Sequence, residues 1–261
     1  MSDKKPIDVF AYNRDSWNKR VAEGDIWSLA VSSEVIAAAR RGDWSVVLTP
    51  TKPVPRAWFP DLKGCRVLAL ASAGGQQAPV LAAAGASVTV FDASPAQLAQ
   101  DGMVAERDGL SLRIEEGNFA DLSRFADASF DLVFHPSSNI FAPDVRPIWR
   151  ECFRVLRSGG RLLAGFVNPV AFAINPARQT KDDLYLRYAL PYSDVGSRTP
   201  EQLERQMANG RSLEWSHSLT DQIGGQTDAG FRIIGLYEDG SESDPLCVYM
   251  PNHVATLAEK P

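Results

Sequence analysis

Between residues 61 and 168, short strand-like runs alternate with segments of helix length, and this alternation constrains the fold more than any other feature. The strand-like runs are CRVLALA, SVTVF, SLRIEE, FDLVF and RLLAGFV, and most of them are apolar, as buried strands should be. Strands that are joined by helical connections form parallel sheets with right-handed crossovers. We therefore expect an α/β fold that is doubly wound around a mostly parallel sheet.

Local signals place the helices between these strands. Ser94 is a suitable N-cap, and Pro95 is a suitable first residue of the helix that follows. Apolar residues between 144 and 157 recur every three or four positions, which predicts a helix that ends at Gly159 and Gly160. Further helices are expected over residues 14–23, 33–41, 76–84, 199–208 and 219–229. We expect two closing strands, one in FRIIGLYE and the last in either CVYM or HVATLA.

Charge and cysteine content exclude several classes of protein. The chain of 261 residues has a formal net charge of −5, so it carries no broad positive field for nucleic acids. Its three cysteines are far apart, which gives neither a disulfide framework nor a paired metal motif and favours a reducing cytoplasm. The start MSDKKPIDVF lacks an apolar core, and no apolar run has the length of a membrane span. We therefore expect no secretory signal and no membrane partner.

Small residues and an acid follow the first two strands, where ligands of open parallel sheets bind. The turn Ala71-Ser72-Ala73-Gly74-Gly75 lets the backbone come close to a ligand, although a tight turn without a ligand explains it as well. Asp92 follows the second strand, where an acid can accept hydrogen bonds from both ribose hydroxyls or can cap the next helix. Together they predict a nucleoside site. The chain has no GxGxxG or Walker A motif, which disfavours dinucleotides and nucleoside triphosphates.

Five stretches, in order, resemble the motifs of the class I S-adenosylmethionine-dependent methyltransferases. VLALASAGG stands where the family usually has VLDLGCGxG, and VTVFDAS stands at the ribose-binding acid. GNFADL stands at the loop after the third strand, SFDLVFH at the fourth strand and RVLRSGGRLL at the step from a helix to the fifth strand. A sixth stretch, AGFRIIGLYE, resembles the C-terminal strand of small-molecule members. The chain departs from the family pattern at Ala69, which replaces an acid, at Ala71 and Ala73, which replace glycines, and at Asn118, which replaces an aspartate.

The resemblance implies a Rossmann-like sheet of seven strands whose last strand is antiparallel, and methyl transfer from S-adenosylmethionine to a small-molecule acceptor through O, N, S or C. It divides the chain into an N-terminal helical lid (1–60), a cofactor-binding core (61–168), an inserted substrate cap (169–217) and a C-terminal completion of the sheet (218–261). We expect a monomer or a homodimer. The implied cofactor contacts are Ala71, Ser72, Ala73, Gly75, Gln76, Gln77, Asp92, Ala93, Gln97, Asn118, Phe119, His135 and, from the lid, Trp17.

His135 is the candidate catalytic base, because it ends the fourth strand beside the expected methyl group, where an imidazole can take a proton from a hydroxyl or a thiol. A buried structural imidazole is the other interpretation of this histidine. Contacts with the acceptor are expected from Tyr12, Asn139, Tyr188, Tyr192 and His217, whereas His253 is expected to be structural. The histidines have no sequence partners at metal-site spacing, so we predict no metal.

Two other functions stay open at this point. The altered glycine motif is compatible with a regulatory protein that binds S-adenosylmethionine or a nucleoside without transferring a methyl group. An NAD-linked oxidoreductase is the second alternative, and the missing GxGxxG motif speaks against it.

Overall fold

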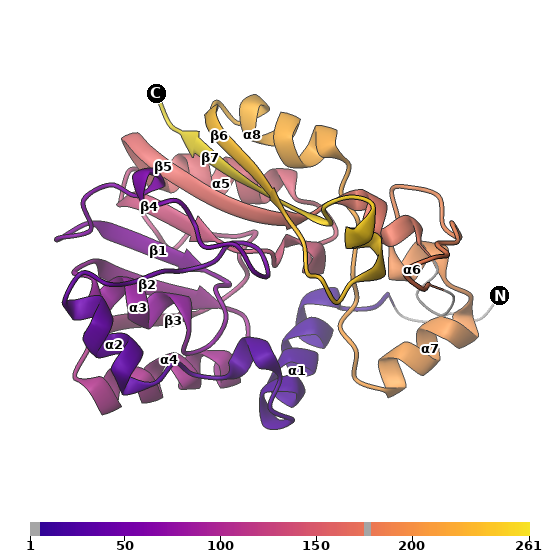
Figure 1. Ribbon diagram of the computed structural model, residues 1–261, viewed down its shortest axis with the longest axis horizontal. Coiled ribbons are helices and arrows are strands. Elements are labelled where there is room, and N and C mark those ends of the chain that lie inside the picture. Colours follow the sequence, from indigo (N-terminus) through magenta and orange to yellow (C-terminus); the bar gives the residue numbers. More distant parts are fainter. Residues whose placement is uncertain (1–5, 175–178) are drawn as a thin grey trace.

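A seven-stranded sheet runs through the middle of the protein, whose computed structural model describes residues 6–174 and 179–261 (Figure 1). The strand order is β3-β2-β1-β4-β5-β7-β6; β7 runs antiparallel to both of its neighbours, and the pairs among β1 to β5 are parallel. This confirms the expected doubly wound sheet. The strands are β1 (Arg66–Leu70), β2 (Ser87–Asp92), β3 (Leu112–Glu116), β4 (Phe130–His135), β5 (Leu156–Val167), β6 (Arg232–Asp239) and β7 (His253–Glu259).

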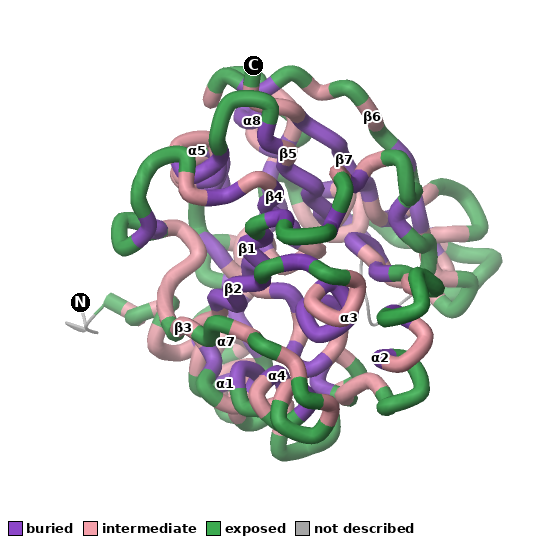
Figure 2. The backbone as a smooth tube through the Cα atoms, turned by 90° about the vertical axis from the view of Figure 1, so that its left-hand side faces the viewer, coloured by how far each residue is buried: buried purple, intermediate pink, exposed green. Residues whose placement is uncertain are grey.

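Helices cover both faces of the sheet, because successive side chains of each strand point to opposite sides. In β1, Val67 and Ala69 belong to one hydrophobic cluster, and Leu68 and Leu70 belong to the other. The first cluster is completed by α2 (Ser33–Arg40), α3 (Gln77–Ala83) and α4 (Pro95–Asp108), and the second by α5 (Arg146–Val155), beside which α8 (Gly225–Asp228) packs. In Figure 2 the central strands β1, β2 and β4 accordingly run through the interior as buried segments, whereas the edge strand β6 is largely exposed or intermediate.

Three further helices, α1 (Val9–Ala22), α6 (Asp194–Ser197) and α7 (Pro200–Ala208), lie beyond one end of the sheet (Figure 1). Residues 1–5 of the predicted lid and 175–178 of the predicted cap lie outside the described residues. Within the described ranges, no helix combines the length and the hydrophobicity that crossing a membrane requires.

The structure differs from the sequence-based expectation at two helix ends. The helix predicted to end at Gly159 ends at Val155, because Leu156 already pairs with Phe130 as the first residue of β5. The helix predicted over 219–229 begins as a π-helical turn, Thr220–Gly224, and continues as the short α8. The last strand lies in HVATLA and not in CVYM.

At Gly225, the first residue of α8, a Cβ would lie 2.8 Å from the indole of Trp149, so the close approach of this ring requires a glycine.

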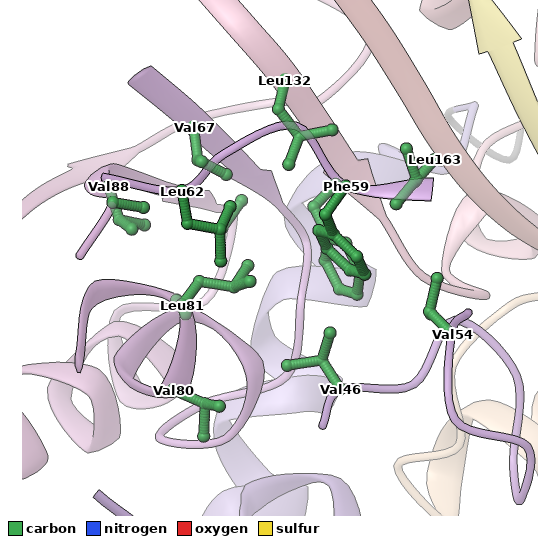
Figure 3. Packing of buried hydrophobic residues seen from close by; sticks show 14 of the residues in the cluster. Val46, Val54, Phe59, Leu62, Val67, Val80, Leu81, Val88, Leu132 and Leu163 are labelled. Atoms are coloured by element: carbon green, nitrogen blue, oxygen red, sulfur yellow. The ribbon is translucent and has the colours of Figure 1, made fainter. Parts of the chain in front are cut away.

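The last part of the predicted lid, residues 46–60, belongs to the core together with Leu62. Val46, Val54, Phe59 and Leu62 pack against strand residues such as Leu132 (Figure 3). The same segment crosses the sheet at β5, where Gly165 lies directly under the backbone of Leu48. The Leu48 carbonyl also accepts hydrogen bonds from the backbone N–H and the hydroxyl of Ser137, at 3.0 and 3.1 Å. Residues 46–62 are therefore fixed on the sheet and do not form a detachable cover.

We predict that Gly165→Ala lowers the free energy of unfolding by about 1–3 kcal/mol, as overpacking of a core does. The new Cβ would lie 2.7 Å from the carbonyl carbon of Leu48, and backbone cannot give way as a flexible side chain can. Gly102→Ala in α4 is the matched control, because its Cβ meets only the Ile114 Cδ1 at 3.6 Å. That control should gain about 0.5–1 kcal/mol. Urea unfolding measures the free energy of unfolding of both variants. A similar loss of stability in both would contradict the close approach of Leu48 to Gly165.

Candidate active site

A cavity of about 510 Å³ lies at the carboxyl ends of the parallel strands. Its walls are formed by the residues that follow β1, β2, β3 and β4, and its roof includes Phe10, Asn13 and Trp17 of α1. The volume is within the range of about 300–1,000 Å³ that is usual for pockets of small organic ligands. The position is the one that open parallel sheets use for ligands.

The turn after β1 has the backbone shape of a glycine turn, although two of its residues are alanines. Ala71 and Ala73 have φ angles of 48° and 67°, in the left-handed region that favours glycine. The amides of Gly74 and Gly75 donate to the side chains of Gln97 and Asp101 on α4, at 2.7 and 2.9 Å. The hydroxyl of Ser72 is buried and has no hydrogen-bond partner among the described residues. The turn is thus held from behind by α4, and it leaves one buried polar atom at the cavity unpaired.

Asp92 ends β2 and lines the cavity. One carboxylate oxygen accepts the amide of Ser94 at 2.8 Å, and no salt bridge pairs it with a basic side chain of the described residues. Burial raises the pKa of Asp92 to about 6, and the hydrogen bonds from the Ser94 and Ala93 amides act in the opposite direction. This carboxylate would therefore be stabilised by hydrogen-bond donors of a ligand.

Helix α1 joins the two sides of the cavity. The side-chain amide of Asn13 donates to the carbonyls of Phe141 and Leu213, and its oxygen accepts the Leu213 amide at 2.8 Å. The ring of Trp17 lies edge-on to Phe141, with ring centroids 5.4 Å apart. At the other side, the amide oxygen of Asn18 accepts the hydroxyl of Ser94 at 2.7 Å. The roof is thus tied both to the loop after β2 and to the segment around residue 213.

Ten of the predicted cofactor contacts lie together on the cavity wall. They are Trp17, Ala71, Ser72, Ala73, Gln77, Asp92, Ala93, Gln97, Asn118 and Phe119. Gly75 and Gln76 lie behind the wall. A Cβ at Gly75 would lie 2.9 Å from that of Ala30, and the Gln76 amide donates to the carbonyls of Ile26 and Leu29. Both residues therefore hold the N-terminal segment against the turn, a role that the family motif does not indicate.

His135 lies inside the core and not on the cavity wall. Because it follows Val133 at a spacing of two, its side chain points to the same face of the sheet, between the rings of Phe119 and Trp149. Its Nδ1 lies 3.0 Å from the Leu70 carbonyl oxygen, and burial lowers the pKa of the imidazole to about 4. This placement argues against the predicted roles of His135 as a base and as a cofactor contact, and favours the structural interpretation.

The five residues expected to contact the acceptor also lie off the wall. Tyr12 donates to backbone carbonyls at the end of α7, and Asn139 is fully buried against Gln222. His217 is buried with its Nε2 3.1 Å from the Asn139 carbonyl oxygen. The rings of Tyr188 and Tyr192 contact each other at a tilt of 57°, with 4.8 Å between ring centroids. The hydrogen bonds and ring contacts of these five residues instead fasten the cap to itself, to α1 and to the loop after β4, and they fasten that loop to the π-helical turn Thr220–Gly224.

The sequence did not single out as site residues several ionisable residues of the wall, which are Arg14, Arg20, Asp144, Glu214 and His253. Glu214 lies between Leu213, which Asn13 holds, and Trp215, whose amide donates to the Ile140 carbonyl at 2.8 Å. Its carboxylate has no hydrogen-bond partner among the described residues, and burial together with the charge of Asp194 raises its pKa to about 7. His253, expected to be structural, also lines the cavity. For Glu214 the sequence carried no signal, because its neighbours resemble no motif.

The sheet order, the glycine-type turn and the acid after β2 define a class, the nucleoside-binding α/β proteins of the methyltransferase type. Residues 68–164 match the family model described as a methyltransferase domain. Over 231 residues, 88% of this chain and 91% of the relative, the sequence is 48% identical to the uncharacterized methyltransferase YbaJ of Bacillus subtilis. The chain therefore belongs to the class I S-adenosylmethionine-dependent methyltransferases. It is an enzyme of that family, and neither a regulatory protein nor an NAD-linked oxidoreductase is favoured.

Solved structures share the fold. An S-adenosylmethionine-dependent methyltransferase from Mesorhizobium loti matches with a TM-score of 0.61 at 18% identity, over 78% of this chain and 95% of that one. A second, from Listeria monocytogenes, matches with a TM-score of 0.59 at 18% identity, over 79% and 95%. At this level of identity the likeness extends to the architecture alone.

We predict that Glu214→Gln stabilises the protein at pH 8 by about 1–2 kcal/mol. This is less than the whole pKa shift of Glu214 would give, because the carboxyl is partly exposed. An acid whose pKa is raised in the folded state favours folding fully below its ordinary pKa of about 4.3, and this contribution is lost as the pH rises through about 7. Urea unfolding at pH 4.5 and pH 8 measures it. The exposed Glu106→Gln is the control, and a gain that does not depend on pH would contradict the raised pKa.

We also predict that Ala73→Gly stabilises the protein by about 1 kcal/mol, which corresponds to about 2–4 °C in Tm. Glycine adopts the observed φ of 67° without the steric cost that alanine pays. Ala105→Gly in the middle of α4 should act in the opposite direction, by about 0.5–1 kcal/mol. Thermal unfolding compares the two variants, and a lower Tm for Ala73→Gly would show that the turn is not strained.

Proposed function

We propose that the cavity binds S-adenosylmethionine across the ends of β1, β2 and β3, and a small-molecule acceptor in its remaining part. The observation that carries this proposal is Asp92, a carboxylate on the cavity wall that lacks a cation partner among the described residues. Two ribose hydroxyls are donors of the number and kind that this carboxylate would accept.

The neighbouring residues suit the other parts of the same molecule. Asn118, at the end of β3, uses its amide oxygen to accept the Ala120 amide at 2.9 Å, so its NH₂ group is the part left to meet a ring nitrogen of adenine. The unpaired hydroxyl of Ser72 and the small side chains of Ala71 and Ala73 suit the methionine part. When bound, S-adenosylmethionine supplies a methyl group on a sulfonium. The protein would hold the acceptor in line with it and exclude water, which accounts for much of the rate in such reactions.

We also retain the remaining sequence-based proposals. The acceptor is a small molecule and neither a nucleic acid nor a membrane lipid, and the protein acts in the cytoplasm as a monomer or homodimer. Of the predicted lid of residues 1–60, the part before residue 46 would cover the cavity, and residues 169–217 would act as a cap around the core of 61–168 and 218–261. The mildly acidic net charge supports the exclusion of nucleic acid.

We predict that Asp92→Ala lowers the affinity for S-adenosylmethionine at least tenfold, because a charge-assisted hydrogen bond contributes about 1.5–3 kcal/mol. Isothermal titration calorimetry measures the change. At pH 6, wild type should also release protons on binding, since ribose hydroxyls stabilise the ionised form of a carboxyl whose pKa is about 6 in the free protein.

Asp92→Asn tests the same assignment without removing the oxygen that accepts the Ser94 amide. It should bind weakly and release no protons at pH 6, whereas the exposed Asp43→Ala should behave as wild type. Unchanged affinity in folded Asp92→Ala and Asp92→Asn would exclude the ribose assignment.

A further inference from the structure

The cavity is longer than the part that the proposed cofactor site would use. Asp92 lies at the end of β2, and His253, on the same cavity wall, begins β7. Four strand spacings separate β2 from β7, or about 19 Å at about 4.8 Å each. The part under β4, β5 and β7 is lined by Thr49, Pro50, Pro136, Ser137, Val167 and His253. This part, the acceptor half, combines the apolar surfaces of two prolines and a valine with the hydroxyls of Thr49 and Ser137, and it has one imidazole at its far end.

The imidazole of His253 is held in one orientation and one tautomer. Its Nδ1 lies 2.7 Å from the side-chain oxygen of Asn252, and the NH₂ group of Asn252 donates to Asp244 at 2.5 Å. Since that amide oxygen is an acceptor, Nδ1 carries the proton and Nε2 carries the lone pair. Strand pairing fixes the backbone too, because His253 is paired with Val167 on one side and with Asp239 on the other.

The Nε2 atom of His253 makes no hydrogen bond within the described part of the chain, and it is not one of the enclosed unpaired atoms, as Nε2 of His135 is. His253 itself is partly exposed and lines the cavity. The hydroxyls of Thr49 and Ser137 in this part already donate to Tyr237 and to the Leu48 carbonyl. The lone pair of Nε2 is therefore the acceptor that selects a ligand with one hydrogen-bond donor.

We propose that Nε2 of His253 accepts the proton of a hydroxyl group on a small aromatic acceptor, which makes this enzyme an O-methyltransferase for phenol-type molecules. The inference rests on the proposed cofactor site at the other end of the cavity. Asn252 is the positioning residue, and Asp244 orients it.

The chemistry balances with the groups at hand. The acceptor oxygen forms a bond to the methyl carbon, the bond between sulfur and methyl breaks, and its electron pair stays on sulfur. The hydroxyl proton moves to Nε2 and leaves later to solvent. Burial lowers the pKa of His253 to about 4, against the charges of Asp239 and Asp244, so the imidazole is neutral at pH 7. Such a weak base suffices, because the proton becomes strongly acidic as the O–C bond forms.

A hydroxyl on an aromatic ring fits better than other acceptor groups. Phenols, with a pKa of about 10, are mostly protonated at pH 7 and gain from a base, whereas thiols at about 8.5 are already partly ionised. Proline and valine side chains and the ring of Phe141 offer apolar surface for a flat ring.

The test measures methyl transfer from tritiated S-adenosylmethionine to phenol, catechol and 1-naphthol, with thiophenol and aniline as the sulfur and nitrogen alternatives. Wild type should methylate at least one of the three hydroxyl compounds. His253→Gln should lower kcat by about 10²–10⁴-fold, the usual contribution of a base. Its affinity for S-adenosylhomocysteine should stay within about twofold of wild type, and Tyr249→Phe, a change at the exposed surface nearby, should transfer at the wild-type rate.

Equal rates of phenol methylation in wild type and His253→Gln would overturn the proposal. So would transfer to thiophenol or aniline alone, or to none of the five while S-adenosylhomocysteine still binds. If wild type does not bind S-adenosylhomocysteine, the proposed cofactor site is refuted, and the proposal for His253 is refuted with it. A second measurement needs no variant: diethyl pyrocarbonate, which acylates accessible neutral imidazoles, should modify His253 and spare the buried His135 and His217. Failure of His253 to react would also overturn the proposal.

Discussion

The burial of the central strands on both faces is the constraint on which the rest of the structure depends. Residues Val67 to Leu70 of β1 are completely inaccessible, and the same is true of Leu132 to His135 in β4. Strands in such an environment satisfy their backbone groups only by pairing with each other, and they leave polar side chains a place only at their ends. The functional groups therefore collect at the carboxyl edge, where Asp92, Asn118 and Ser137 meet although they are far apart in the sequence.

The roof of the cavity depends on a small number of polar contacts between distant segments. Asn13 makes three hydrogen bonds to the backbone of residues 141 and 213, and Leu48 accepts two from Ser137. These bonds join two segments outside the sheet, α1 and the chain around Leu48, to the loop after β4, and they join α1 also to the cap. Because Gly165 allows the backbone of Leu48 to lie directly on β5, this arrangement is both close-packed and specific.

Unpaired acids give the cavity its electrostatic character. Burial raises the pKa values of Asp92 to about 6 and of Glu214 to about 7, and it raises that of Asp101, behind the turn, well above the usual range. Burying such groups away from water lowers the stability of the folded protein, and buried groups with shifted pKa values are found most often at functional sites. Asp144 is a third carboxyl on the wall, and the two arginines there, Arg14 and Arg20, are each paired with another acid, Asp15 and Asp25. The cavity therefore favours a ligand that brings hydrogen-bond donors or positive charge, and a sulfonium nucleoside brings both.

The sequence by itself determined the strands, the helices between them and the acid after β2, because these follow from local patterns of period two and of three to four and from motifs within single loops. It also indicated the altered turn at Ala71 and Ala73, whose positive φ angles keep the glycine-type backbone. Only the tertiary structure decided which histidine meets the cavity. His135 stands at the expected strand end, yet the alternation of side chains turns it into the core, whereas His253 reaches the wall because β7 is inserted between β5 and β6. The placement of Leu48, Glu214 and His253 around one space depends on the order of strands in the sheet, and no spacing along the chain encodes that order.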